Sequence, residues 1–130
     1  MRYGVYLGAS MGQQNVIAQR TRELLALGVR INSTWPFQAS GALTEAAMLE
    51  IANRDIRELL LSQLVIIDAT VKSSTNGLHS EAGAALGSLA ELWAIYDPAV
   101  EPNVFLRKAK RFDSWEIARA ALLDLHARRN

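Results

Sequence analysis

The chain has 130 residues, half of them hydrophobic, with 14 basic residues, 13 acidic residues and no cysteine. This length suits a single domain over residues 1–130, and the near-neutral charge gives no overall attraction to nucleic acid or to an anionic membrane. Without cysteine there are no disulfides or thiolate zinc sites, and the two histidines lie too far apart in sequence for a metal cluster. No apolar run reaches about 18 residues, so we expect a cytoplasmic protein that does not contact a membrane. We also expect no bound metal and no cofactor.

The first half of the chain alternates predicted strands and helices. Residues 3–9 (YGVYLGA) form an apolar run bounded by glycine, which predicts a buried strand. Residues 13–28 then show helical spacing of apolar side chains and end on a glycine, a common helix stop. A second strand is predicted over residues 29–35. After a loop, Thr44 can cap a helix over residues 45–62.

The second half continues the same alternation. Residues 63–70 (QLVIIDAT) are strongly apolar and β-branched, which predicts a central strand covered on both faces. A polar loop, a helix over residues 79–89 and a strand over residues 91–97 follow. Asp113, with a glutamate three residues on, forms a capping box for a closing helix over residues 114–129. The order predicts a doubly wound α/β fold, flavodoxin-like or Rossmann-like, with about five mainly parallel strands and helices on both faces.

In such open sheets a ligand binds beyond the carboxyl ends of the strands, which places three loops around one crevice: residues 8–13, 35–41 and 70–77. Glu81 begins the helix that opens onto this crevice. As a first-turn acid it would lie at the positive end of the helix dipole, which keeps a carboxylate ionised, as a nucleophile requires. The same position is common for acids with no chemical role, so the sequence leaves both interpretations open.

Asp55 interrupts the apolar stripe of the predicted helix over residues 45–62. On a helical wheel it falls among Met48, Ile51, Ile56 and Leu59. A charge pointed at the core is costly unless it is paired or functional. A structural role at the mouth of the core, with hydrogen bonds to backbone or hydroxyl groups, is the alternative.

Five other residues near the crevice also have two interpretations each. Tyr6 is either a core aromatic or a site hydroxyl, and Ser10 is either a turn former or a ligand contact. Trp35 and Phe37 can stack on a nucleobase or cover the core beneath a loop. Asp68, at the end of the third strand, fits a loop cap better than a ligand contact.

Four stretches, in this order and at suitable spacing, resemble the nucleoside 2-deoxyribosyltransferase family and its relatives, the 2'-deoxynucleoside 5'-phosphate N-hydrolases: VYLGAS, NRDIRELLLSQLVIIDAT, STNGLHSEAGAALG and NVFLRKAKRFDSWEIA. The likeness covers about residues 3 to 125. It implies that Glu81 is a nucleophile, and that Tyr6 and Asp55 are also catalytic. It further implies a homodimer or higher homo-oligomer with shared sites, in which Asn103 reaches the site of a neighbouring subunit.

The candidate substrate-binding residues are Gly8, Ser10, Trp35, Phe37, Asp68, Thr75, Gly77 and Asn103. Thr75 stands where the transferases commonly carry an acid and the hydrolases a serine, which favours the hydrolases. The loop after the first strand lacks the arginine of the hydrolases, so a phosphate would have to be held by Ser10, Gln13, Thr75 and backbone amides.

The resemblance therefore implies a small-molecule nucleoside or nucleotide as substrate, with a free nucleobase as the second partner. Transfer of a deoxyribosyl group to another base is the leading hypothesis. The alternatives are an N-glycoside hydrolase of deoxynucleoside 5'-monophosphates and a catalytically silent nucleotide-binding or sensor module.

Overall fold

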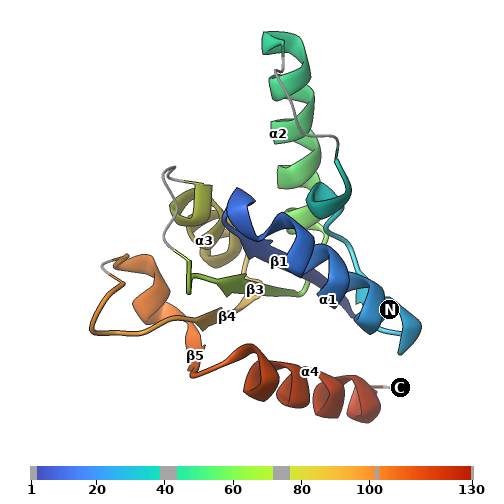
Figure 1. The fold of residues 1–130 in the computed structure, drawn as a ribbon, viewed down its shortest axis with the longest axis vertical. Coiled ribbons are helices and arrows are strands. Elements are labelled where there is room, and N and C mark those ends of the chain that lie inside the picture. The colour runs from blue at the N-terminus through green and yellow to red at the C-terminus, as the bar shows by residue number, and fades with distance from the viewer. Residues whose placement is uncertain (1–2, 39–43, 72–76, 102, 130) are drawn as a thin grey trace.

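The computed structural model describes residues 3–38, 44–71, 77–101 and 103–129. Its centre is a five-stranded parallel sheet in the order β2-β1-β3-β4-β5 (Figure 1). The strands are β1 (Gly4–Ala9), β2 (Arg30–Ile31), β3 (Leu64–Asp68), β4 (Glu91–Ile95) and β5 (Lys110–Phe112). The α-helices are α1 (Gln14–Ala26), α2 (Glu45–Leu60), α3 (Gly77–Gly87) and α4 (Trp115–Arg129). The chain therefore has the doubly wound α/β fold that the alternation of strands and helices predicts.

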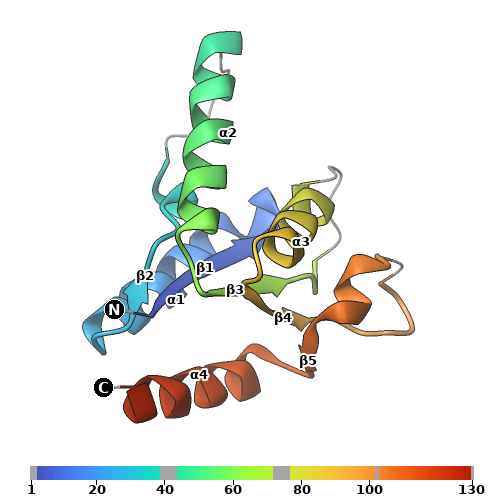
Figure 2. The same cartoon turned by 180° about the vertical axis from the view of Figure 1, so that it is seen from behind.

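The helices form a layer on each face of the sheet. Tyr6 of β1 contacts α3, whereas its neighbour Val5 lines a cavity together with residues of α1 and α4. Successive side chains of a strand point to opposite faces, so α3 covers one face while α1 and α4 cover the other. An ion pair between Arg119 and Glu23 joins α4 to α1. Figures 1 and 2 show this arrangement from opposite sides.

The ends of the helices follow from local chemistry, with one departure from prediction. Gly28 adopts φ +85°, a left-handed conformation that favours glycine, just after α1 ends. Thr44 caps α2 by accepting a hydrogen bond from the Ala47 amide at 3.1 Å. The cap predicted at Asp113 for α4 is wrong: Ser114 accepts from the Ile117 amide at 3.3 Å, while Asp113 pairs with an arginine.

The second strand is much shorter than predicted, and side chains replace its missing part. Beyond Ile31 the chain leaves the sheet, but Ser33 Oγ accepts a hydrogen bond from the Leu7 amide at 3.0 Å. Trp35 Nε1 donates to the Leu7 carbonyl at 2.7 Å, and Trp35 is only 4% exposed. These side chains thus provide hydrogen-bond partners for the backbone amide and carbonyl of Leu7, close to the carboxyl end of β1.

Helix α2 projects from the body of the molecule (Figures 1 and 2). Leu59 is the buried residue of the apolar stripe that the sequence predicts to face the core. Met48 and Ile56 are about half exposed, so the prediction that this whole stripe is buried is wrong for the single chain. A second stripe shares Ile56 with the first and is formed by Leu49, Ile56 and Leu60 at helical spacing. Each of these three side chains is more than half exposed.

Two further features complete the fold. Strand β5 lies after Asn103, in a segment rich in lysine and arginine where alternation and apolar runs predict no strand. It pairs with β4 through Phe112 opposite Ile95. Among the described residues, no helix combines the length and the apolar character needed to cross a lipid bilayer.

Candidate functional site

The side chains of Glu81 and Tyr6 meet at the carboxyl end of β1. Tyr6 is fully buried, and its hydroxyl donates a hydrogen bond to Glu81 Oε1 at 3.1 Å. The other carboxylate oxygen, Oε2, is buried without a hydrogen-bond partner among the described residues. A buried polar atom without a partner is costly, and such atoms are typical of sites where a ligand completes the contacts.

Gly8 makes room for this carboxylate. A Cβ atom added to Gly8 would lie 2.5 Å from Glu81 Oε2, closer than real Cβ atoms come to an oxygen. Glycine therefore lets the carboxylate lie against β1 in this position, and any larger residue here would displace it. Tyr6 and Gly8 are two residues apart on β1 and therefore lie on the same face of the sheet. Tyr6 bonds one oxygen of Glu81, and Gly8 leaves space for the other.

The protonation of Glu81 differs from the sequence-based expectation. Helix α3 begins at Gly77, so Glu81 lies in its second turn and receives little from the helix dipole. Burial raises the pKa of Glu81 to about 7, an effect that the hydrogen bond from Tyr6 opposes and the nearby charge of Asp55 reinforces. The carboxyl group is thus poised near neutrality, where it can change its charge during a reaction.

Asp55 faces the same pair of residues from α2. Its charge raises the pKa of both Glu81 and Tyr6, which places the three groups in one electrostatic cluster. Burial raises the pKa of Asp55 as well, while the guanidinium of Arg54, 3.6 Å away, lowers it. Asp55 Oδ1 is buried without a hydrogen-bond partner among the described residues. The structure thus brings together Tyr6, Asp55 and Glu81.

Two polar side chains follow β1 into the same end of the sheet. Ser10 and Gln13 are each 6% exposed, and Ser10 Oγ and Gln13 Oε1 have no hydrogen-bond partner among the described residues. Both lie at the carboxyl end of the strand that carries Tyr6 and Gly8. Because these buried oxygens lack a partner, they are candidates for contacts with a polar ligand that enters this end of the sheet.

Two of the candidate substrate-binding residues have structural contacts instead. Trp35 is buried and bonded to β1, so it does not stack on a ligand in this structure. Asp68 Oδ2 pairs with Arg20 at 2.6 Å, and its Oδ1 accepts from the amide and hydroxyl of Thr70. Burial acts to raise the pKa of Asp68, but these hydrogen bonds and the charge of Arg20 outweigh it and lower the pKa.

The remaining candidates lie in varied surroundings. Phe37 is half exposed, with the guanidinium of Arg22 5.2 Å from its ring centroid. Thr75 lies outside the described residues, and Gly77 is the first residue of α3. Asn103 is 2% exposed, and its Oδ1 accepts from the Phe105 amide of its own chain at 2.9 Å. In this single chain Asn103 therefore shapes a turn, and its entry into a neighbouring site stays a prediction.

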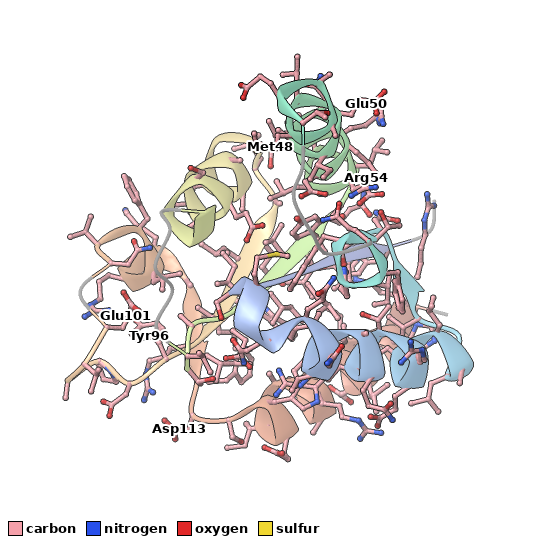
Figure 3. The ribbon with its side chains drawn as sticks, turned by 45° about the horizontal axis from the view of Figure 1, so that its top comes forward. Met48, Glu50, Arg54, Tyr96, Glu101 and Asp113 are labelled. Carbon is pink, nitrogen blue, oxygen red and sulfur yellow. The ribbon has the colours of Figure 1, made fainter. Side chains whose placement is uncertain are left out.

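Arg54 is a neighbour of the site that the sequence did not indicate. Its guanidinium lies beside Asp55 and donates to the Gln38 side chain, which ties α2 to the segment after Phe37. Figure 3 shows Arg54 on α2 together with Met48 and Glu50. Adjacent residues of a helix point in different directions. The helical pattern of the sequence therefore gave no sign that Arg54 would lie beside Asp55.

Two cavities lie away from this cluster. One, of about 680 Å³, is at the amino end of the sheet, and one, of about 740 Å³, lies beside Tyr96, Glu101 and Asp113. Figure 3 shows these three residues on the far side of the molecule from α2. Neither cavity is lined by Tyr6, Asp55 or Glu81. Among the described residues, no three His, Cys, Asp or Glu side chains gather in a way that could hold a metal ion.

Comparison with known proteins supports the fold without naming a function. No protein-family model matches the chain, and no curated protein matches it. Among solved structures it is similar to a conserved protein from Enterococcus faecalis V583, with a TM-score of 0.63 and 15% sequence identity over the whole of both chains. At this identity the likeness shows a shared α/β fold across the full length of both proteins.

Proposed function

We propose that this protein cleaves the N-glycosidic bond of a deoxynucleoside through a covalent glycosyl intermediate on Glu81 and passes the sugar to another base. The observation that carries the proposal is the Glu81 carboxylate, held by Tyr6 at one oxygen and left without a partner at the other. Asp55 supplies a second carboxyl group in the same cluster. Two carboxyl groups, one as nucleophile and one as acid, are the usual equipment for retaining glycoside cleavage.

In the first step Glu81 Oε2 attacks C1' of the sugar. The bond from C1' to the base nitrogen breaks, and the base takes a proton from Asp55 as it leaves. Tyr6 stays protonated, because burial first and the charge of Glu81 second raise its pKa, so it donates to the carboxylate throughout. Its hydrogen bond at Oε1 keeps the opposite oxygen directed away from the tyrosine and toward the sugar.

In the second step a nitrogen of an incoming base attacks C1' and releases Glu81 as a carboxylate. The incoming base loses its proton to Asp55, which returns the site to its starting state. Ser10 and Gln13, whose buried oxygens lack partners, would hold the 5' end of the sugar or its phosphate. The sequence comparison with the hydrolases suggested Ser10 and Gln13 for that task together with Thr75, which lies outside the described residues, and backbone amides.

Hydrolysis is the second candidate, and one observation favours it. Trp35 and Asn103, two of the candidate substrate-binding side chains, are buried within their own chain, so neither is available to keep water from the glycosyl intermediate. Unless a partner subunit covers the site, water can reach C1' in the second step, and the product is then free sugar.

A product assay tests the proposal. The protein is incubated with a deoxynucleoside, or with its 5'-monophosphate, in the presence and absence of a second free base, and the products are separated by chromatography. A new nucleoside supports transfer, and free sugar with free base supports hydrolysis. Binding without any release of base supports a sensor and would overturn the enzymatic proposal.

The covalent intermediate is tested with a 2'-fluoro-arabino nucleoside, which slows the second step. We expect mass spectrometry to find the added sugar on the peptide that contains Glu81. Glu81→Gln should lose at least about 10³-fold in base release while keeping its fold, a loss typical of removing a nucleophile. Equal labelling of the wild type and of Glu81→Gln would contradict the assignment.

A further inference from the structure

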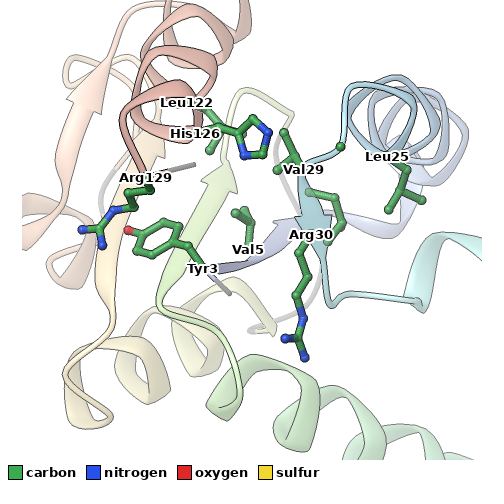
Figure 4. Close-up of a pocket in the computed structure, with 10 residues that line it drawn as sticks. Tyr3, Val5, Leu25, Val29, Arg30, Leu122, His126 and Arg129 are labelled. Carbon is green, nitrogen blue, oxygen red and sulfur yellow. The ribbon is translucent and has the colours of Figure 1, made fainter. Parts of the chain in front are cut away.

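The 680 Å³ cavity lies on the face of the sheet opposite to Glu81, at the amino ends of β1 and β2 (Figure 4). Its walls come from three elements of the chain: Leu25 from α1, Val5 from β1 and Leu122 from α4. His126 also packs here, since a Cβ atom on Gly28 would lie 3.7 Å from its Nε2. The volume is within the range of small-molecule pockets, about 300–1,000 Å³.

The floor of this cavity is apolar and its margin is cationic. Val5, Val29 and Leu122 are buried, whereas the side chains of Arg30 and Arg129 extend along two sides of the opening (Figure 4). No carboxylate is among the residues that line it. Among the described residues, neither arginine forms an ion pair, in contrast to Arg20, Arg111 and Arg119 elsewhere.

Aromatic and hydrogen-bonding groups add to this margin. The guanidinium of Arg129 lies 4.3 Å from the ring centroid of Tyr3. Burial, and then the Glu91 carboxylate near its hydroxyl, raise the pKa of Tyr3, so the phenol remains neutral. Arg30 Nε donates to Asn32 Oδ1 at 3.1 Å, which leaves its terminal amino groups toward solvent. The Glu91 carboxylate thus contacts Tyr3, and among the described residues it forms no ion pair with either arginine.

We propose that this cavity is a second ligand site, which binds a small anion with an aromatic body. The apolar floor accepts the ring system, and the two guanidinium groups attract the negative charge at the opening. Val5 and Tyr6 are adjacent on β1 but point to opposite faces of the sheet, so the site is distinct from the one around Glu81. The proposal does not depend on any activity at Glu81.

Binding of 2-naphthoate, an aromatic carboxylate of suitable size, tests the proposal. In a two-dimensional amide NMR titration of the full chain we expect shifts at Val29, Arg30 and Leu122, with no comparable shift at Gly8 or Glu81. The neutral 2-naphthalenemethanol should bind about five- to tenfold more weakly, the factor expected for two exposed charge contacts.

Charge variants distinguish binding at this cavity from nonspecific attraction of the anion to any basic side chain. Arg30→Gln with Arg129→Gln should weaken 2-naphthoate binding by the same factor, whereas Arg57→Gln with Lys108→Gln, which removes two exposed charges elsewhere, should leave it unchanged. Three results would overturn the proposal: no binding, shifts confined to the Glu81 site, or equal affinity for the acid and the alcohol.

Discussion

At the residue scale, Gly8 and Glu81 form a close contact that a larger residue at position 8 could not preserve. Gly8→Ala would place a methyl group 2.5 Å from Glu81 Oε2 and force the carboxylate to move. Because Tyr6 holds the other oxygen, the movement would also disturb that hydrogen bond. We expect base release to fall at least about 10²-fold, in keeping with the sensitivity of catalysis to misplacement by about 1 Å. Steady-state kinetics of the purified variant measure the loss.

Gly83→Ala is the matched control for this change. Gly83 lies in α3, two residues from Glu81, and a Cβ atom there would meet no heavy atom within 4 Å. Alanine is favoured over glycine within a helix by about 1 kcal/mol. This variant should therefore keep its activity and unfold at a slightly higher temperature. A similar loss of activity in both variants would show that Gly8 has no special relation to the carboxylate.

The raised pKa of Glu81 also predicts how stability changes with pH. The folded state binds a proton at Glu81 more tightly than the unfolded state, whose pKa is near 4.5. The free energy of unfolding therefore falls as pH rises from about 4.5 to about 7, by on the order of 3 kcal/mol. Glu81→Gln removes this penalty, so the variant should be more stable than the wild type at pH 8 and not at pH 4.5. Thermal unfolding at both pH values tests the prediction, and a variant that is less stable at both would contradict it.

The same two carboxyl groups predict a bell-shaped pH dependence of base release. The reactive form needs Glu81 ionised and Asp55 protonated; above about pH 7 both are ionised, and at low pH both are protonated. We expect a maximum of kcat/KM below pH 7. A 2-deoxyriboside of 4-nitrophenol, whose leaving group needs no proton, should instead react faster as pH rises through about 7. Identical profiles for the two substrates would count against Asp55 as the acid.

At the element scale, the carboxyl end of β1 depends on side chains that take the place of a strand. Trp35 donates to the Leu7 carbonyl, while Trp93, equally buried, has an Nε1 without a partner among the described residues. Trp35→Phe should lower the free energy of unfolding by about 1–3 kcal/mol more than Trp93→Phe, because only the first leaves a buried carbonyl unsatisfied. Chemical denaturation measures both, and equal losses would mean that the Trp35 hydrogen bond contributes nothing.

Elements with a strong local signal could be predicted from the sequence. The glycine after α1, the threonine before α2 and the apolar run of β3 mark their boundaries within a few residues. The short β2 could not be predicted, because its apolar and β-branched residues suit a strand but the Ser33 and Trp35 side chains take over its hydrogen bonds. Strand β5 was missed because its three residues, Lys110–Phe112, are mostly charged and are held by pairing with β4.

The site was predictable where the topology decides which side chains meet. Tyr6 lies on the first strand and Asp55 interrupts an apolar stripe; in the structure Tyr6 donates to Glu81, and Asp55 lies near enough for its charge to raise the pKa of Glu81. The electrostatics were not predictable, because the pKa of Glu81 depends on where α3 begins and how deeply the carboxylate is buried. The burial of Trp35 was also not predictable, because the sequence left both base stacking and core packing open for this residue.

At the scale of the whole molecule, α2 exposes more apolar surface than a single chain can cover. Leu49, Ile56 and Leu60 lie along one side of the helix and are each more than half exposed. Asp55 is on the same helix with part of its side chain open to solvent. We propose that a second copy of the chain packs on this stripe and covers it together with the exposed part of Asp55, in line with the homo-oligomer that the resemblance implies.

The proposed oligomer gives the last prediction. Leu49→Lys with Ile56→Lys places two charges on the stripe and should convert the oligomer to monomers, as seen by sedimentation or light scattering. Leu27→Lys with Ile117→Lys changes two similarly exposed apolar residues, one just after α1 and one on α4, and should leave the assembly intact. If the partner shields Asp55 from water, the first pair should also shift product from transferred nucleoside toward free sugar. A wild-type protein that is already monomeric at micromolar concentration would refute the interface. An assembly that persists in both double variants would show that the interface does not involve α2.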